Sequence, residues 1–271
     1  MAIGINGTPG APTTFGGGTT HTHSYTIAGG ARRKAIMHVN YKTTTQSINT
    51  PLFNGNAMTT LLAPTPLASD GGIVSAMYYY DIPDGLGDGA YNFSITTTAS
   101  TANGTVYGWV LSDATSGAPT DSDSNDAVDP DAVAEILLTN AAGAFILAAM
   151  ANTANGQTHT WTNDVTERHD TAWGAGRTTS ADGVDATGNA TVTCTASGTT
   201  NSRQMIAAAF IEDLGASTSG AFGGLAGHGG LAGPGGLAGI GGGLAGFVKL
   251  GNIYRSKRWL WLPRGLAPQG I

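Results

Sequence analysis

A glycine at every third position from Gly224 to Gly242 is the feature that most restricts how this chain can fold. A period of three matches extended left-handed helices with three residues per turn, whose glycine edges let neighbouring backbones approach closely. The pattern therefore predicts a stalk in which copies of the chain, three in the simplest case, lie against one another. The stalk residues are Gly224, Gly227, Gly230, Gly233, Gly236, Gly239 and Gly242, with Leu225, Leu231 and Leu237 on the neighbouring edge.

Two other interpretations of the glycine repeat stay open. Gly/Ala-rich segments often serve as flexible linkers, although the variable positions here hold Leu, Ile and Pro where a linker would hold Ser. A short hexapeptide β-helix has a similar period, but so few repeats could not bury a core. Pro234 is the one proline in the repeat, so a triple helix would depend on the segments that flank it.

The remainder of the chain has the composition of a β-rich protein with many turns. It contains 42 glycines in 271 residues, only 11% charged residues and 41% apolar residues, which is enough to build a core. Short alternating segments recur between Gly, Asn, Asp and Pro, as expected for a β-sandwich or jelly-roll-like domain. The expected strands are 23–27, 34–42, 58–62, 73–80, 91–97, 106–111, 158–162, 171–177, 188–195 and 205–211.

The segment from Asp129 to Met150 is ambiguous. Its acidic start around Pro130 resembles a helix N-terminus, whereas Asn140-Ala141-Ala142-Gly143 resembles a turn between strands 133–139 and 144–152. The turn residues favour the two strands.

Together these patterns predict four parts. They are an N-terminal arm (1–20), a β-sandwich domain (21–214), a Gly-rich three-residue-per-turn stalk (215–246) and a basic aromatic tail (247–271).

The order of motifs in the predicted sandwich resembles a known family. Residues 21–30, 34–41 and 51–58 come first, and the motifs Met77-Tyr78-Tyr79-Tyr80 and Gly89–Ile95 follow. Trp109–Asp113 then precedes an acidic segment. Over roughly residues 15–213 this order is similar to a β-sandwich domain of tailed-phage virion proteins. The resemblance implies a structural or adhesive module.

Candidate chemistry in the sequence is sparse. His21 and His23 lie on one face of a strand and could be two metal ligands, but no third is near in sequence unless several copies meet on an axis. Asp121–Asp126 resembles a calcium loop, yet Asp126 and Ala132 stand where an EF-hand needs Gly and a carboxylate. The segment is therefore expected to be an acidic, solvated loop, with a calcium site of another type as the alternative.

The sequence contains two further candidates for reactive chemistry, a charged cluster and a cysteine. Glu167-Arg168-His169-Asp170 gathers acid–base groups without a nucleophile motif and is expected to be a surface cluster. The single cysteine, Cys194, lies on the apolar side of an alternating run and is expected to be a core residue. We expect no catalytic residue, no cofactor and no enzymatic activity.

Charge divides the chain into two unlike parts. All acidic residues lie at or before Asp213, so residues 1–220 carry a net charge of −11 and residues 221–271 carry +5. The tail interleaves these cations with aromatic residues, a composition suited to docking on a partner protein. The expected anchor residues are Arg255, Lys257, Arg258, Trp259, Trp261 and Leu262.

The sequence thus favours a non-enzymatic phage virion protein, a homotrimeric capsid decoration or head fibre held by its C-terminal region. The alternative is a tail fibre or receptor-binding protein, or a free carbohydrate-binding adhesin whose partner is a host-surface glycan. Nucleic acid is a less favoured partner. No signal peptide and no membrane span are expected, which suits assembly in the host cytoplasm.

Overall fold

The computed structural model describes residues 3–42, 47–49, 51–64, 72–98, 103–127, 133–174, 176–198 and 202–213. The regular elements in these residues are all β-strands, so the described part of the chain is all-β. No helix in it is long and apolar enough to cross a bilayer. The predicted stalk (215–246) and anchor tail (247–271) lie outside the described residues.

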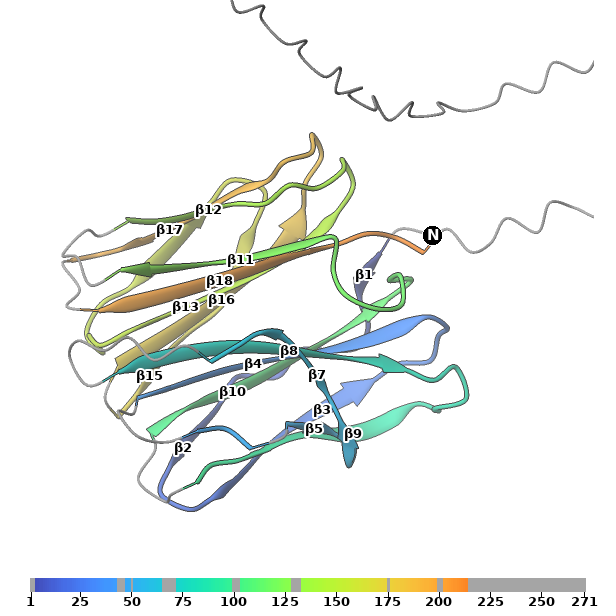
Figure 1. The fold of residues 1–271 in the computed structure, drawn as a ribbon, viewed down its shortest axis with the longest axis horizontal. Coiled ribbons are helices and arrows are strands. Elements are labelled where there is room, and N and C mark those ends of the chain that lie inside the picture. The colour runs from blue at the N-terminus through green and yellow to red at the C-terminus, as the bar shows by residue number, and fades with distance from the viewer. Residues whose placement is uncertain are drawn as a thin grey trace, which may run out of the picture. The chain divides into compact units, whose positions relative to one another are not determined.

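Four antiparallel sheets are arranged in layers (Figure 1). Outer sheet 1 contains β3 (Thr20–Ile27), β9 (Gly89–Thr96), β5 (Leu52–Phe53) and β6 (Asn56–Ala57). Inner sheet 1 contains β1 (Gly4–Ile5), β2 (Thr13–Gly16), β10 (Asn103–Ser112), β4 (Arg33–Lys42), β8 (Ile73–Ile82) and β7 (Thr59–Leu62). Inner sheet 2 contains β11 (Asp121–Ala127), β18 (Arg203–Phe210), β13 (Phe145–Asn152), β16 (Gly176–Val184) and β15 (Thr166–Trp173). Outer sheet 2 contains β12 (Val133–Leu137), β17 (Thr191–Ala196) and β14 (His159–Thr162).

Three apolar cores fill the spaces between these layers. The first lies between outer and inner sheet 1, where Tyr25, Phe53 and Phe93 are buried. The second lies between outer and inner sheet 2, which together form the second sandwich, and it includes Met150 and Cys194. The expected core role of Cys194 is confirmed, since its thiol is free and buried.

A third core joins the two sandwiches, and we call this interface between the inner sheets the seam. Large side chains come from inner sheet 1, and inner sheet 2 contributes both large side chains and two alanines, Ala149 and Ala208. Its main members are Ile36, Met77, Tyr107, Trp109 and Leu111 on one side and Phe145, Leu147, Ala149, Ile206, Ala208 and Phe210 on the other.

The two sandwiches have the same strand order. The inner sheets run β2-β10-β4-β8-β7 and β11-β18-β13-β16-β15, and the outer sheets run β3-β9-β5 and β12-β17-β14. Paired in this way, the eight strands of the second sandwich follow the same chain order as eight strands of the first, and only β1 and β6 of the first have no counterpart among the described strands. Corresponding strands β9 and β17 also lead into similar sequences, Ile-Thr-Thr-Thr-Ala-Ser at 95–100 and Val-Thr-Cys-Thr-Ala-Ser at 192–197. The described body is therefore a repeated sandwich.

Burial explains how the sequence pattern differs between outer and inner strands. β3 and β12 alternate between exposed and buried residues, as expected for strands with one face in water. The inner strands β13 and β18 are buried at every position, and β4 at all but its last. The half-buried strand expected at 34–42 is thus covered on both faces. Ile36, the apolar exception on its polar side, belongs to the seam core.

Several local expectations change in the structure. Within residues 1–20, β1 and β2 pair with β10, so this segment is part of inner sheet 1 rather than an extended arm. The ambiguous segment forms strands β12 and β13, and no helix occurs in its described residues. Asp121–Ala127 is the edge strand β11 and not a loop. The single strand expected at 171–177 is instead divided between the end of β15 and the start of β16, which pair with each other.

Candidate functional site

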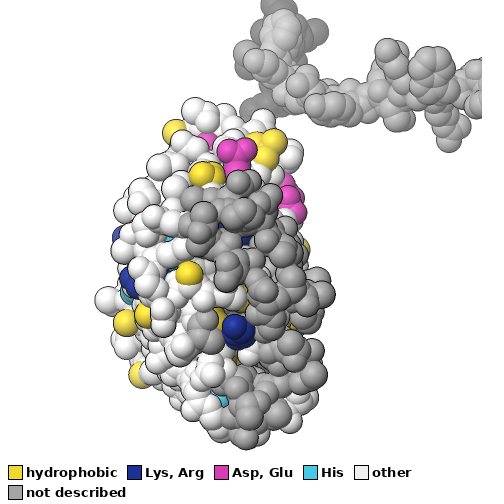
Figure 2. Space-filling view, turned by 90° about the vertical axis from the view of Figure 1, so that its left-hand side faces the viewer, with side chains coloured by type: hydrophobic (Ala, Val, Ile, Leu, Met, Phe, Trp, Pro, Cys, Tyr) yellow, Lys and Arg dark blue, Asp and Glu magenta, His cyan; other side chains and the backbone are white. Residues whose placement is uncertain are grey.

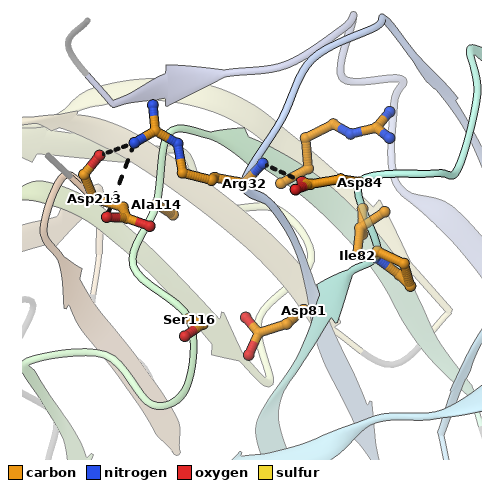
Figure 3. A pocket seen from close by; sticks show the side chains of 9 residues that line it. Arg32, Asp81, Ile82, Asp84, Ala114, Ser116 and Asp213 are labelled. Carbon is orange, nitrogen blue, oxygen red and sulfur yellow. Dashed lines mark hydrogen bonds and ion pairs between the residues drawn. The ribbon is translucent and has the colours of Figure 1, made fainter. Parts of the chain in front are cut away.

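A surface pocket of about 280 Å³ opens beside the seam. It is built by the turn before β4, the end of β8, the turn that follows β8, and the segments that follow β10 and β18 (Figure 3). Its lining residues are Arg32, Arg33, Asp81, Ile82, Pro83, Asp84, Ala114, Ser116 and Asp213. The pocket therefore collects charged groups from both sandwiches.

Arg32 holds one side of this pocket together, with a backbone φ of +53° that non-glycine residues seldom adopt. Its guanidinium donates to Asp113 Oδ1 at 2.8 Å. It also donates to the carbonyl oxygen of Asp213 at 2.5 Å (Figure 3). Its backbone N–H donates to Asp84 Oδ1 at 2.9 Å. We call Arg32, Asp113 and Asp213 the Arg32 clasp. It ties the ends of β10 and β18, which are corresponding strands, to the start of β4.

The other side of the pocket contains a second ion pair. Lys34 is buried and pairs with Asp81, and its ammonium also donates to the carbonyl oxygen of Gly117 at 2.5 Å. Burial lowers the pKa of Lys34, and Asp81 opposes that shift. Asp81 Oδ2 accepts the backbone N–H of Gly117 at 2.7 Å. The charged groups of the pocket thus form ion pairs and hydrogen bonds within the protein. These contacts are typical of a structural junction between segments.

We expect Arg32→Gln to lower the free energy of unfolding by about 1–2 kcal/mol, because the clasp loses charge-assisted hydrogen bonds that join three segments. Urea unfolding followed by circular dichroism measures the loss. Lys42→Gln, which removes a cation from β4 outside the clasp, is the control and should change stability by less than about 0.5 kcal/mol. Equal effects of the two substitutions would show that the clasp contributes nothing.

The acid–base cluster expected at Glu167–Asp170 lies on β15, but its side chains point to different partners. A β-bulge interrupts the pairing between Glu167 and His169. Arg168 forms a bidentate pair with the buried Asp182, at 2.7 and 2.6 Å. His169 Nε2 lies 2.9 Å from the hydroxyl of Tyr107, across the seam. No reacting centre is formed where these residues could act together.

Asp170 belongs instead to a buried imidazole–carboxylate pair. Its Oδ1 lies 3.0 Å from His159 Nδ1 and accepts a hydrogen bond from Arg177 Nε at 2.5 Å. Burial raises the pKa of Asp170, but the hydrogen bonds from His159 and Arg177 outweigh it and leave that pKa lowered. The other nitrogen of His159 lies 2.7 Å from Asn152 Nδ2 inside the protein. This pair joins β14 to β15, and the imidazole of His159 is closed off from solvent.

His21 and His23 do share one face of β3, as predicted, but that face is buried. His21 stacks on Phe15 with ring centroids 4.0 Å apart, and His23 Nδ1 lies 3.1 Å from Thr13 Oγ1. Burial lowers both pKa values, that of His23 to about 4. Among the described residues no group of three His, Cys, Asp or Glu could hold a metal. Imidazoles enclosed in this way could not meet those of other copies on an axis.

Cys194 also lies away from any candidate chemistry. Burial raises the pKa of its thiol, so the nucleophilic thiolate is suppressed.

The outward faces of both outer sheets are rich in hydroxyl groups. On β3 and β9 the outward residues are Thr20, Thr22, Ser24, Thr26, Ala90, Asn92, Ser94 and Thr96, none of them charged. On outer sheet 2 they are Thr160, Thr162, Thr191, Thr193 and Thr195, beside Val133, Glu135 and Leu137. Charged side chains are also few and scattered on the face that Figure 2 shows. Alternation in the sequence predicted some of these outward-facing residues. It did not show that the two outer sheets occupy equivalent places in the two sandwiches.

The clasp and the seam contacts were not predicted from sequence, because their partners are far apart in the chain. Arg32 meets a residue 81 positions away and another 181 positions away. Comparisons of the chain with protein-family models, curated proteins and solved structures find no match.

Proposed function

We propose that the chain is a non-enzymatic structural protein of a phage virion, a capsid decoration or head-fibre protein. In this proposal the jelly-roll-like double sandwich is displayed outward, the glycine repeat joins three copies, and the tail anchors the protein on the particle. The protein is assembled in the host cytoplasm. The stacked body is the observation that supports this role most directly. Several of its charged groups pair with one another, and its outer faces are rich in uncharged hydroxyl groups.

A receptor-binding protein or free adhesin remains the second proposal. The hydroxyl-rich outer faces favour it, because Ser, Thr and Asn side chains can both donate and accept hydrogen bonds with a sugar. Binding of the full-length protein to a glycan array, lost when Thr160, Thr162 and Thr193 are changed together to Lys, would support this role. Particle association that survives the same change would favour the structural role.

The glycine repeat offers a sharp test of the trimer. We expect Gly233→Val to shift the full-length protein from a trimer towards a monomer, because Gly233 occupies the repeating position at which the proposed stalk requires the backbones to touch. Gly235→Val, at a variable position of the same triplet, is the matched control and should keep the trimer. Light scattering with size-exclusion chromatography measures the mass. A monomeric parent protein, or equal effects of both substitutions, would contradict the trimeric stalk.

Attachment is tested separately by deleting residues 222–271. The truncated protein should keep the far-ultraviolet circular dichroism of its strands and should fail to co-sediment with particles that lack the protein. Co-sedimentation equal to that of the full-length chain would contradict anchoring through the tail. Polysaccharide hydrolysis that is abolished by Glu167→Gln would contradict a non-enzymatic role.

A further inference from the structure

His38 occupies an unusual position in the seam between the two sandwiches. It lies on β4, paired in register with Tyr107 on one side and Met77 on the other, and is only 2% exposed. Its ring lies 6.4 Å from that of Trp109, centroid to centroid. Its Nε2 has no hydrogen-bond partner among the described residues. A hydrogen bond with Asn40 therefore uses the other ring nitrogen.

Asn40 connects His38 to the polar contacts that cross the seam. Its amide donates to Thr178 Oγ1 on β16 and accepts a hydrogen bond from Ser75 Oγ at 2.5 Å. The backbone N–H of Ser75 in turn donates to the side chain of Gln204 on β18. These residues are all buried. The arrangement of His38 is thus coupled to hydrogen bonds between the two inner sheets.

The charged groups on the surrounding strands already have partners. Lys34 pairs with Asp81, Arg168 pairs with Asp182, and His169 contacts Tyr107. The inner sheets carry further ionisable residues on the strands around the seam. They are Arg33, Tyr41 and Lys42 on β4, Tyr78, Tyr79 and Tyr80 on β8, Asp121, Asp123 and Asp126 on β11, Glu167 and Asp170 on β15, Arg177 on β16 and Arg203 on β18. β13 has none. No carboxylate contributes to the titration of His38. A proton on this ring would place an uncompensated cation in an apolar interface, which is costly.

We propose that the seam is an acid-sensitive junction, in which protonation of His38 loosens the contact between the two sandwiches before their own cores open. The proton on Nε2 would have no acceptor, and the charged ring would need water. Opening of the seam admits that water. The first sandwich also buries two imidazoles, His21 and His23, whose Nε2 has no hydrogen-bond partner among the described residues. Burial lowers the pKa of His23 less than that of His38, to about 4, so we expect protonation to open the seam first.

The pH range follows from the two states of His38. Burial lowers its pKa to about 3, and the hydrogen bond with Asn40 opposes this only in part, whereas the ordinary value is 6.5. The closed seam therefore keeps His38 neutral while a solvated ring takes up a proton below pH 6.5. The stabilisation is complete above that pH and declines as the pH falls towards about 3. In this range the equilibrium for opening rises by up to about tenfold per pH unit.

Methionines in the three cores provide a direct measurement. Met77 is in the seam core, Met37 is in the first sandwich and Met150 is in the second, and all are fully buried. Brief peroxide treatment of the full-length protein, followed by mass spectrometry, reports which methionine becomes accessible. We expect Met77 to be oxidised at a higher pH than Met37 and Met150. Simultaneous oxidation of all three, or oxidation of Met77 last, would overturn the proposal.

A substitution identifies His38 as the responsible group. His38→Gln keeps a side chain that can bond Asn40 but cannot titrate, and it should move the onset of Met77 oxidation down by about one pH unit. His21→Gln removes a buried imidazole of the first sandwich and should leave that onset unchanged. If His38→Gln does not fold, an NMR titration of the parent protein with labelled histidine measures the pKa of His38 in the folded state instead. A folded-state titration of His38 near pH 6.5 would overturn the proposal.

Discussion

Gly104→Ala should lower the free energy of unfolding by about 3 kcal/mol or more, because an added Cβ has no space in the sheet. Gly104 lies on β10 between Phe15 and Tyr41, its partners on the neighbouring strands. The Cβ would approach Phe15 Cζ to 2.6 Å and Tyr41 Cα to 2.8 Å, and it would also meet the carbonyl oxygen of Asn40. Two of these three atoms are backbone, so rotation of a side chain cannot relieve the clash.

Gly85→Ala is the matched control for this prediction. Gly85 lies in the turn that follows β8, with no atom within 4 Å of the added Cβ and no positive φ. The control should change stability by less than about 0.5 kcal/mol. Urea unfolding of both variants, followed by circular dichroism, measures the difference. Similar midpoints for Gly104→Ala and Gly85→Ala would show that the sheet at β10 is more adaptable than its packing indicates.

Trp109→Ala should remove about 3–5 kcal/mol of stability, the usual cost of truncating a fully buried Trp. The indole is 0% exposed and packs edge-on against Tyr107, with ring centroids 4.4 Å apart. Across the seam lie β13 and β18, which are buried at every position. Because these strands are packed on both faces, they could move only partly into the cavity left by the indole. The loss would show that the interface between the sandwiches contributes to the stability of the body.

Leu137→Ala tests whether the loss at Trp109 comes from burial in the seam. Leu137 is a large apolar residue of outer sheet 2, but it is 62% exposed. Its truncation should cost less than about 0.5 kcal/mol in the same urea titration. A small effect at Trp109, comparable to that at Leu137, would mean that the sandwiches do not depend on their contact.

Local pattern predicted much of the strand content. Alternation located β3 and β17, and the turn at Asn140–Gly143 correctly favoured strands over a helix. It failed for β11, where Asp-Ser-Asp-Ser-Asn-Asp has low strand propensity. Pairing with β18 and hydrogen bonds such as that from the N–H of Thr139 to Asp121 hold this segment as an edge strand. Tertiary contacts therefore overrode propensity.

The candidate sites were less predictable than the strands. The cluster at 167–170 and the pair His21 and His23 were found from residue type, yet their side chains turn towards internal partners. The Arg32 clasp left no signal in the sequence, since a single Arg in a turn has no local pattern. Contacts over 81 and 181 positions depend on how the sandwiches stack.

By itself, the sequence determined that the described chain is all-β, because alternation and turn residues act over a few neighbouring positions. It also showed Cys194 to be a core residue for the same reason. Only the tertiary structure decided that there are two sandwiches, and that Ile36, His38 and Asn40 lie in a seam. Alternation records which side chains share a face, but covering that face requires an inner sheet from a distant part of the chain.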